Sequence, residues 1–76
     1  MRTLVISIYD SGWEFNAASL SNSDYSLLDD NDTNELYNIY DYHGFEDYAN
    51  LIFEWAKNHN YNNVTICADG RICFRN

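Results

Sequence analysis

Positive charge is scarce in this 76-residue chain, which has four lysines and arginines against twelve aspartates and glutamates. No lysine or arginine occurs between Arg2 and Lys57. Proteins that bind nucleic acid neutralise phosphates with these basic side chains, and anionic membranes attract the same side chains. The formal net charge of −8 therefore argues against direct binding to nucleic acid or to a membrane.

Proline is absent, and there are only three glycines and two cysteines. No linker or repeat divides the chain, so we expect one small acidic domain over residues 1–76. Cys67 and Cys73 are too few for a disulfide framework. The apolar stretch Leu4–Ile8 is too short for a signal-peptide core or a membrane span. We therefore expect a cytoplasmic protein with reduced thiols.

Motifs for catalysis are also missing. No glycine-rich loop is present to hold phosphates, and no motif joins a serine or cysteine to a histidine and an orienting acid. A domain of this size also has little room for a deep pocket. We expect no enzymatic activity and no cofactor.

Two sets of residues resemble metal ligands only in part. Asp30, Asp32 and Asn34 match the first three ligand positions of an EF-hand loop, but Glu35 stands at the required glycine and Asp41 at the bidentate glutamate. The cysteines and histidines lack the paired spacing of a zinc module. These residues are Cys67, Cys73, His43 and His59. We expect no metal site from either set.

Alternating apolar residues predict a β-hairpin at the start of the chain. Residues 3–9 and 13–18 read as strands, and Asp10-Ser11-Gly12 is a turn signal between them. A loop centred on Ser11 and Gly12 pairs Ile8 with Phe15 and Ile6 with Ala17. One face of the hairpin is then apolar, and we expect it to form part of the core: Leu4, Ile6, Ile8, Phe15 and Ala17.

A second hairpin is predicted at the other end of the chain. A three-residue loop, Ala68-Asp69-Gly70, with glycine in the left-handed conformation, pairs Ile66 with Ile72 and Val64 with Phe74. A two-residue Asp69-Gly70 loop would mix polar and apolar residues on each face. Because a slip of one residue exchanges the faces, the hydrophobic pattern favours the three-residue loop.

The middle of the chain predicts helices. Apolar residues recur at spacings of three and four over Phe45–His59, which predicts a helix that ends in the asparagine-rich stretch 58–63. Asp32 with Glu35 is typical of a capped helix start, so we expect a short second helix through residues 33–42. The tyrosines there also fit a strand over Leu36–Tyr42, which leaves both alternatives open. Residues 19–31 are expected to be mostly loop.

Together these elements predict an α+β fold in the order β-β-α-α-β-β. The N-terminal and C-terminal hairpins would share one antiparallel sheet, packed on one face by one long and one short helix. The first or second strand could offer a free edge of the sheet for pairing.

Tyrosines are interleaved with carboxylates from Asp24 to Asp47, in the segment without lysine or arginine. A one-sign surface of this kind destabilises a compact protein by self-repulsion, so its presence favours a positively charged partner. Carboxylates can imitate a row of phosphates, and tyrosines provide rigid contact area. We expect the partner-binding residues to be Asp24, Asp29, Asp30, Asp32, Glu35, Tyr37, Tyr40, Asp41, Tyr42, Glu46 and Asp47.

In size, acidity and tyrosine content, the chain resembles small acidic inhibitors that occupy nucleic-acid-binding sites. These include phage anti-CRISPR and anti-restriction proteins, DNA-mimicking glycosylase inhibitors and immunity proteins of nuclease toxins. The resemblance implies an inhibitor, as a monomer or homodimer, of a basic nucleic-acid-binding protein such as a nuclease or nucleoprotein complex. The alternative is a structural or assembly module that pairs through a sheet edge or an apolar face, with its acidity serving solubility.

Overall fold

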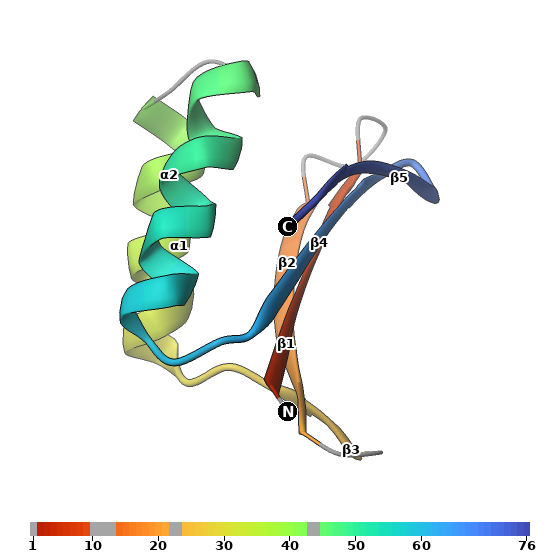
Figure 1. Ribbon diagram of the computed structural model, residues 1–76. Helices are drawn as coiled ribbons and strands as arrows, with labels where there is room; N and C mark the ends of the chain where they lie inside the picture. Colours follow the sequence, from red (N-terminus) through yellow and green to blue (C-terminus); the bar gives the residue numbers. More distant parts are fainter. Residues whose placement is uncertain (1, 10–13, 22–23, 43–44) are drawn as a thin grey trace.

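The computed structural model describes residues 2–9, 14–21, 24–42 and 45–76. Over these residues the α+β fold is confirmed, with a five-stranded sheet covered on one face by two helices (Figure 1). The predicted turn at Asp10-Ser11-Gly12, the strand start at Trp13 and the position of His43 lie outside the described residues. In chain order the elements are β1 (Arg2–Tyr9), β2 (Glu14–Ser21), β3 (Asp24–Leu27), α1 (Asp30–Tyr42), α2 (Phe45–Asn58), β4 (Asn63–Ala68) and β5 (Arg71–Arg75).

The sheet has the order β3-β2-β1-β4-β5, and its central pair, β1 with β4, is parallel. The predicted antiparallel sheet is therefore wrong for this pair, although the other three pairs are antiparallel. The two helices explain the parallel pairing. They run in opposite directions and return the chain to the end of the sheet where β1 begins, so β4 starts beside the start of β1 (Figure 1). Both β1 and β2 are paired on two sides, so the free edges of the described sheet are β3 and β5 instead.

The N-terminal hairpin has the predicted register. Ile8 lies opposite Phe15, and Ile6 lies opposite Ala17. The predicted apolar face is buried against the helices, with Leu4 and Ile6 fully inaccessible to solvent. Burial of each large apolar side chain contributes about 1.5–3 kcal/mol, so this face is a main source of stability.

Helix α2 agrees with its prediction to within one residue. Its apolar stripe is buried in the core and consists of Tyr48, Ala49, Ile52, Trp55 and Ala56. Asn60 ends the helix in the left-handed conformation, with φ of 67°. The Tyr61 N–H donates to the Ala56 carbonyl at 2.9 Å and the Asn60 N–H to the Lys57 carbonyl at 3.3 Å. These two bonds form a Schellman motif, which places His59 at the helix end.

The segment over residues 33–42 is helical, so the alternative of a strand there is wrong. Helix α1 begins at Asp30 and has 13 residues, close to the 14 of α2, and is not the short helix expected. Its cap is Asp29, not Asp32, because Asp29 Oδ1 accepts a hydrogen bond from the Asp32 N–H at 2.8 Å. Leu36 anchors the helix in the core with no exposed surface.

Strand β3 occupies part of the segment expected to be loop. Its four side chains are all exposed, so no buried face identifies the strand. The strand nevertheless pairs with β2, with Tyr25 opposite Leu20 and Leu27 opposite Ala18. It adds a narrow edge to the sheet beyond the predicted hairpin.

The turn of the C-terminal hairpin differs from the prediction. Ala68 pairs with Arg71, so the loop has two residues, Asp69 and Gly70. Their φ angles are 52° and 80°, and positive φ at both positions is typical of a type I′ turn. The predicted three-residue loop is therefore wrong.

An irregularity further along this hairpin restores its apolar face. Cys67 pairs with Ile72 but Ile66 pairs with Phe74, which leaves Cys73 as an extra residue in β5. Phe74 consequently packs against the core, as expected. Ile72 does not, and it is 57% exposed on the other side of the sheet.

Candidate protein-binding surface

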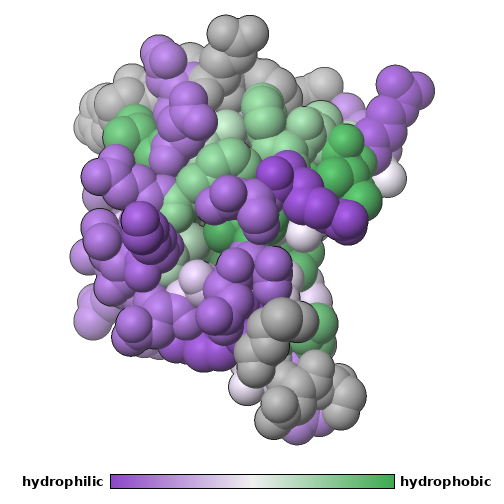
Figure 2. Space-filling model, viewed as in Figure 1, coloured by the Kyte–Doolittle hydropathy of each residue, from purple (hydrophilic) through white to green (hydrophobic). Residues whose placement is uncertain are grey.

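The helices and the residue before them carry only negative charge up to Ala56, which precedes Lys57 in the last turn of α2. Between Asp29 and Ala56 there are eight carboxylates and no lysine or arginine. Figure 2 shows hydrophilic residues gathered over the helices, on the left of the view, and hydrophobic residues between the helices and the sheet. We call this set the acidic layer: Asp29, Asp30, Asp32, Glu35, Asp41, Glu46, Asp47 and Glu54.

Positive charge lies mainly on the sheet. All three arginines belong to strands, with Arg2 on β1 and Arg71 and Arg75 on β5. Arg2 lies with its guanidinium carbon 4.3 Å from the centre of the Tyr61 ring, and its Nη1 donates to the His59 carbonyl at 3.2 Å. The separation gives the protein an acidic helical side and a sheet that carries its arginines.

The start of α1 holds four of the predicted binding residues close together. Asp29, Asp30 and Glu35 are exposed, and Asp32 is half-buried. Carboxylates in the first turn interact favourably with the helix dipole, so the fold tolerates this concentration of charge. Asp29 also caps the helix, so its carboxylate has a structural role whatever it binds.

Other predicted acids lie at the opposite end of the helix pair. Asp41 is in the last turn of α1 and Asp47 in the first turn of α2, and both are exposed. A 13-residue helix is about 20 Å long, which is the distance that the acidic layer spans. Asp24 is exposed on β3, away from the helices. The side chains of Tyr42 and Glu46 lie outside the described part of the chain.

Two of the predicted tyrosine anchors pack partly into the core. The Tyr37 ring lies edge-on to Phe15, with ring centres 4.8 Å apart, and its hydroxyl accepts a hydrogen bond from the Phe15 N–H at 3.3 Å. Tyr40 stacks on Phe15 at 5.1 Å and contacts Tyr48 edge-on at 5.4 Å. Each ring is half-buried, so a partner can contact only the exposed remainder.

Glu35 connects the two helices. Its Oε2 accepts a hydrogen bond from the Trp55 Nε1–H at 2.9 Å and lies 3.7 Å from His59 Nε2. The sequence gives no sign of this group, because Trp55 and His59 follow Glu35 by 20 and 24 residues. No motif has such a spacing, and only the packing of α1 on α2 brings these side chains together.

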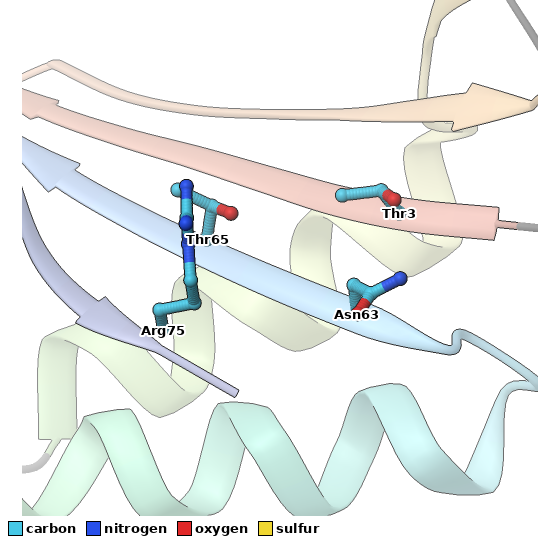
Figure 3. Close-up of a pocket in the computed structure, with 4 residues that line it drawn as sticks. All are labelled: Thr3, Asn63, Thr65 and Arg75. Carbon is cyan, nitrogen blue, oxygen red and sulfur yellow. The ribbon is translucent and has the colours of Figure 1, made fainter.

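A polar hollow lies on the face of the sheet opposite the helices. It has a volume of about 300 Å³ and is lined by Thr3, Asn63, Thr65 and Arg75 (Figure 3). Hydroxyl, amide and guanidinium groups face it, and it is wide open to solvent. These four groups supply neither a nucleophile with a base nor a pair of carboxylates, so the hollow itself does not form an acid–base site.

Comparison with protein-family models, with curated proteins and with solved structures found no match to this chain. Neither described helix is long and apolar enough to cross a membrane. The surface of the molecule is therefore the guide to its function.

Proposed function

We propose that this protein is a small acidic, non-enzymatic inhibitor that occupies the basic nucleic-acid-binding surface of a partner protein. The partner would be a nuclease or another nucleic-acid-handling protein or nucleoprotein complex. The proposal depends on one observation, which is the acidic layer of eight carboxylates without an intervening lysine or arginine. An inhibitor of this kind is a DNA or RNA mimic, of which phage anti-CRISPR and anti-restriction proteins are examples.

The geometry of the acidic layer suits this function. The backbone that carries it consists of two packed helices and the residue before them, so less entropy is lost on association. Arginine binds carboxylate and phosphate with the same two-pronged geometry, which allows a carboxylate to replace a phosphate in a basic cleft. The one-sign field also speeds association with a cationic surface.

The proposal is tested on a partner captured from a lysate at low salt, eluted in a salt gradient and identified by mass spectrometry. The triple variant Asp30→Asn, Asp41→Asn and Asp47→Asn removes three exposed carboxylates and leaves the Asp29 cap intact. We expect it to bind the purified partner at least about tenfold more weakly, which is about 1.4 kcal/mol. The wild-type protein should displace nucleic acid from that partner in a fluorescence anisotropy assay.

A matched control changes the net charge equally on the sheet. Asn16→Lys, Ser21→Lys and Asn76→Lys introduce three positive charges at exposed positions outside the helices. This variant should keep most of the wild-type affinity. Equal loss in both triple variants, or full affinity in the Asn variant, would contradict binding through the acidic layer.

A second candidate function is a structural or assembly module that pairs through the edge of its sheet. The observation that favours it is β3, an edge strand on which Tyr25 is 61% and Leu27 82% exposed. Large exposed apolar side chains on a free edge can pair with another strand. Salt separates the candidates, because a complex formed by charge weakens between about 0.1 and 0.5 M salt. A salt-resistant dimer in size-exclusion chromatography would support the assembly module.

A further inference from the structure

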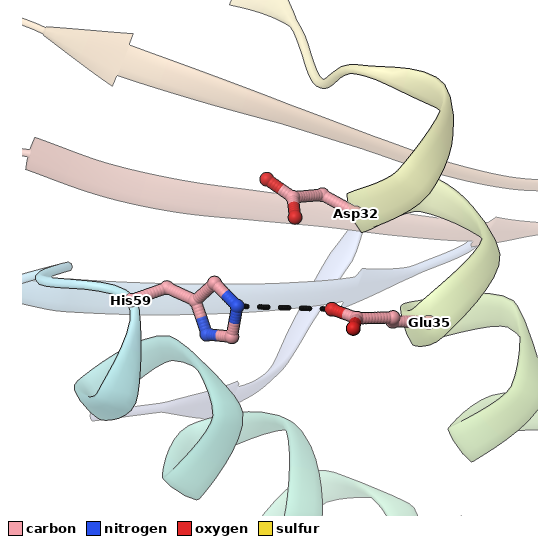
Figure 4. A group of neighbouring side chains, drawn as sticks. All are labelled: Asp32, Glu35 and His59. Carbon is pink, nitrogen blue, oxygen red and sulfur yellow. Dashed lines mark ion pairs between the residues drawn. The ribbon is translucent and has the colours of Figure 1, made fainter.

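Two carboxylates and one imidazole meet where the start of α1 packs against the end of α2. Asp32 and Glu35 lie one turn apart on α1, and His59 follows the last residue of α2. One potential ligand atom from each residue lies within 4.8 Å of the others. Figure 4 shows both carboxylates projecting from α1 toward the end of α2, where the imidazole lies.

The imidazole of His59 has a defined orientation. Its Nδ1 lies 2.7 Å from the backbone carbonyl of Trp55. A carbonyl oxygen can only accept a hydrogen bond, so Nδ1 carries a proton. The lone pair of Nε2 in the neutral ring then faces Glu35. Histidines that bind metals commonly have this arrangement, with one ring nitrogen bonded to a carbonyl and the other toward the metal.

The distance between His59 and Glu35 fits a bridging ion better than a direct hydrogen bond. Nε2 and Oε2 are 3.7 Å apart, beyond the range of up to about 3.2 Å of an N–H···O bond. Zinc lies about 2.0–2.2 Å from nitrogen and oxygen ligands, and a tetrahedral angle then separates two ligand atoms by about 3.4 Å. All three ligand atoms lie within 4.8 Å of one another, so rotation of the carboxylate side chains would bring them to this spacing.

One buried residue supports both ligands. Besides accepting the His59 bond at its carbonyl, Trp55 donates its indole N–H to Glu35 Oε2 at 2.9 Å. Its ring also stacks on the imidazole, with centres 3.9 Å apart and planes 16° apart. Trp55 is only 9% exposed, so its position is fixed by the core. A carboxylate accepts several hydrogen bonds, which leaves Glu35 free to bind an ion as well.

We propose that Asp32, Glu35 and His59 bind a divalent first-row transition metal ion of the zinc class. One nitrogen and two oxygen ligands suit these ions, whereas calcium requires six to eight oxygens. Three protein ligands leave a position for water or for a ligand from a partner. The site is distinct from the EF-hand and cysteine–histidine sets considered in the sequence. Its test does not depend on the inhibitor function, because it needs no partner protein.

Zinc is titrated into the full chain by isothermal titration calorimetry. The background is Cys67→Ser and Cys73→Ser, since both thiols are free and would bind zinc themselves. We expect one ion per chain, and at least tenfold weaker binding in His59→Gln and in Glu35→Gln. Asp41→Asn and Asp47→Asn are matched controls, because each removes an exposed carboxylate of the same layer and should leave the affinity unchanged.

Two readouts keep the proposal testable if a variant is poorly folded. Far-ultraviolet circular dichroism checks each variant, and amide NMR spectra of the wild-type chain locate the bound ion without substitution. Shifts concentrated at residues 32–35 and 55–59 would support the site. Absence of saturable binding, shifts centred elsewhere, or wild-type affinity in a folded His59→Gln variant would overturn it.

Discussion

At the end of α2, the indole of Trp55 lies between the core and the acidic layer. Its ring packs inside the molecule and stacks on His59, and its N–H holds the carboxylate of Glu35. The positions of these two ionisable side chains therefore depend on core packing. A buried ring thus orients two side chains that reach the surface, which favours a preorganised site.

Another single side chain, that of Asp29, has both a structural and an electrostatic role. We expect Asp29→Ala to lower the free energy of unfolding by about 1 kcal/mol, because the Asp32 N–H loses its capping acceptor. Asp30→Ala is the matched control, since it removes an adjacent exposed carboxylate that is not the cap. Its effect should stay within about 0.5 kcal/mol. Urea denaturation measures both values, and equal effects would show that the cap is unimportant.

Among the elements, the C-terminal hairpin combines a tight turn with an extra residue in β5. The two-residue turn at Asp69 and Gly70 matches the right-handed twist of its strands. The extra residue at Cys73 then returns Phe74 to the core face. Phe74 contacts Phe53 of α2 edge-on, with ring centres 6.5 Å apart, so the irregularity connects this edge of the sheet to the helices.

Substitution of Gly70 tests this turn. We expect Gly70→Ala to destabilise the protein by about 1–2 kcal/mol, because its φ of 80° is costly for a residue with a Cβ. A Cβ there has no neighbour within 4 Å, so the cost is conformational and not a clash. Gly70→Asn should cost less, since asparagine tolerates this conformation. Equal melting temperatures for the wild type and the Ala variant would contradict the left-handed conformation of Gly70 in this turn.

Elements with a buried face were predictable from the sequence, and exposed ones were not. The β1–β2 register follows from Ile6 and Ile8, because a slip of one residue would expose both. Strand β3 has only four residues and no buried side chain, so the core does not mark it in the sequence. The sequence predicted an extra residue in the loop before Arg71, which would turn Phe74 inward. The extra residue is Cys73 in β5 instead, and it gives Phe74 the same inward position.

For the candidate site, the sequence predicted its charge but not its geometry. The acidic layer is visible in the sequence because it depends only on which residues occur between Arg2 and Lys57. The group of Asp32, Glu35 and His59 depends on the crossing of two helices, which local patterns do not encode. The burial of Tyr37 and Tyr40 against Phe15 likewise follows only from the packed structure.

Over the whole molecule, the acidic layer should limit stability. A net charge of −8 on a chain of this size creates self-repulsion in the compact state. We expect the melting temperature to rise by several degrees, or about 1 kcal/mol, between about 0.02 and 0.5 M sodium chloride as screening increases. The rise should be smaller for the variant Asp30→Asn, Asp41→Asn and Asp47→Asn. An identical rise in melting temperature for the wild type and this variant would show that salt acts in a general way and not by screening the acidic layer. Differential scanning calorimetry gives the measurement.

The parallel pairing of β1 with β4 also has a consequence for how the chain is made. Thr3 lies opposite Asn63 and Ile6 opposite Ile66, so β1 acquires its central neighbour only after the intervening residues have been synthesised. Contacts of such large sequence separation slow folding. Until then β1 presents a strand edge with apolar side chains, which is the kind of surface that aggregates or recruits chaperones during translation. A nascent chain arrested before residue 63 would lack β4, the parallel neighbour of β1, and β1 could then pair only with β2.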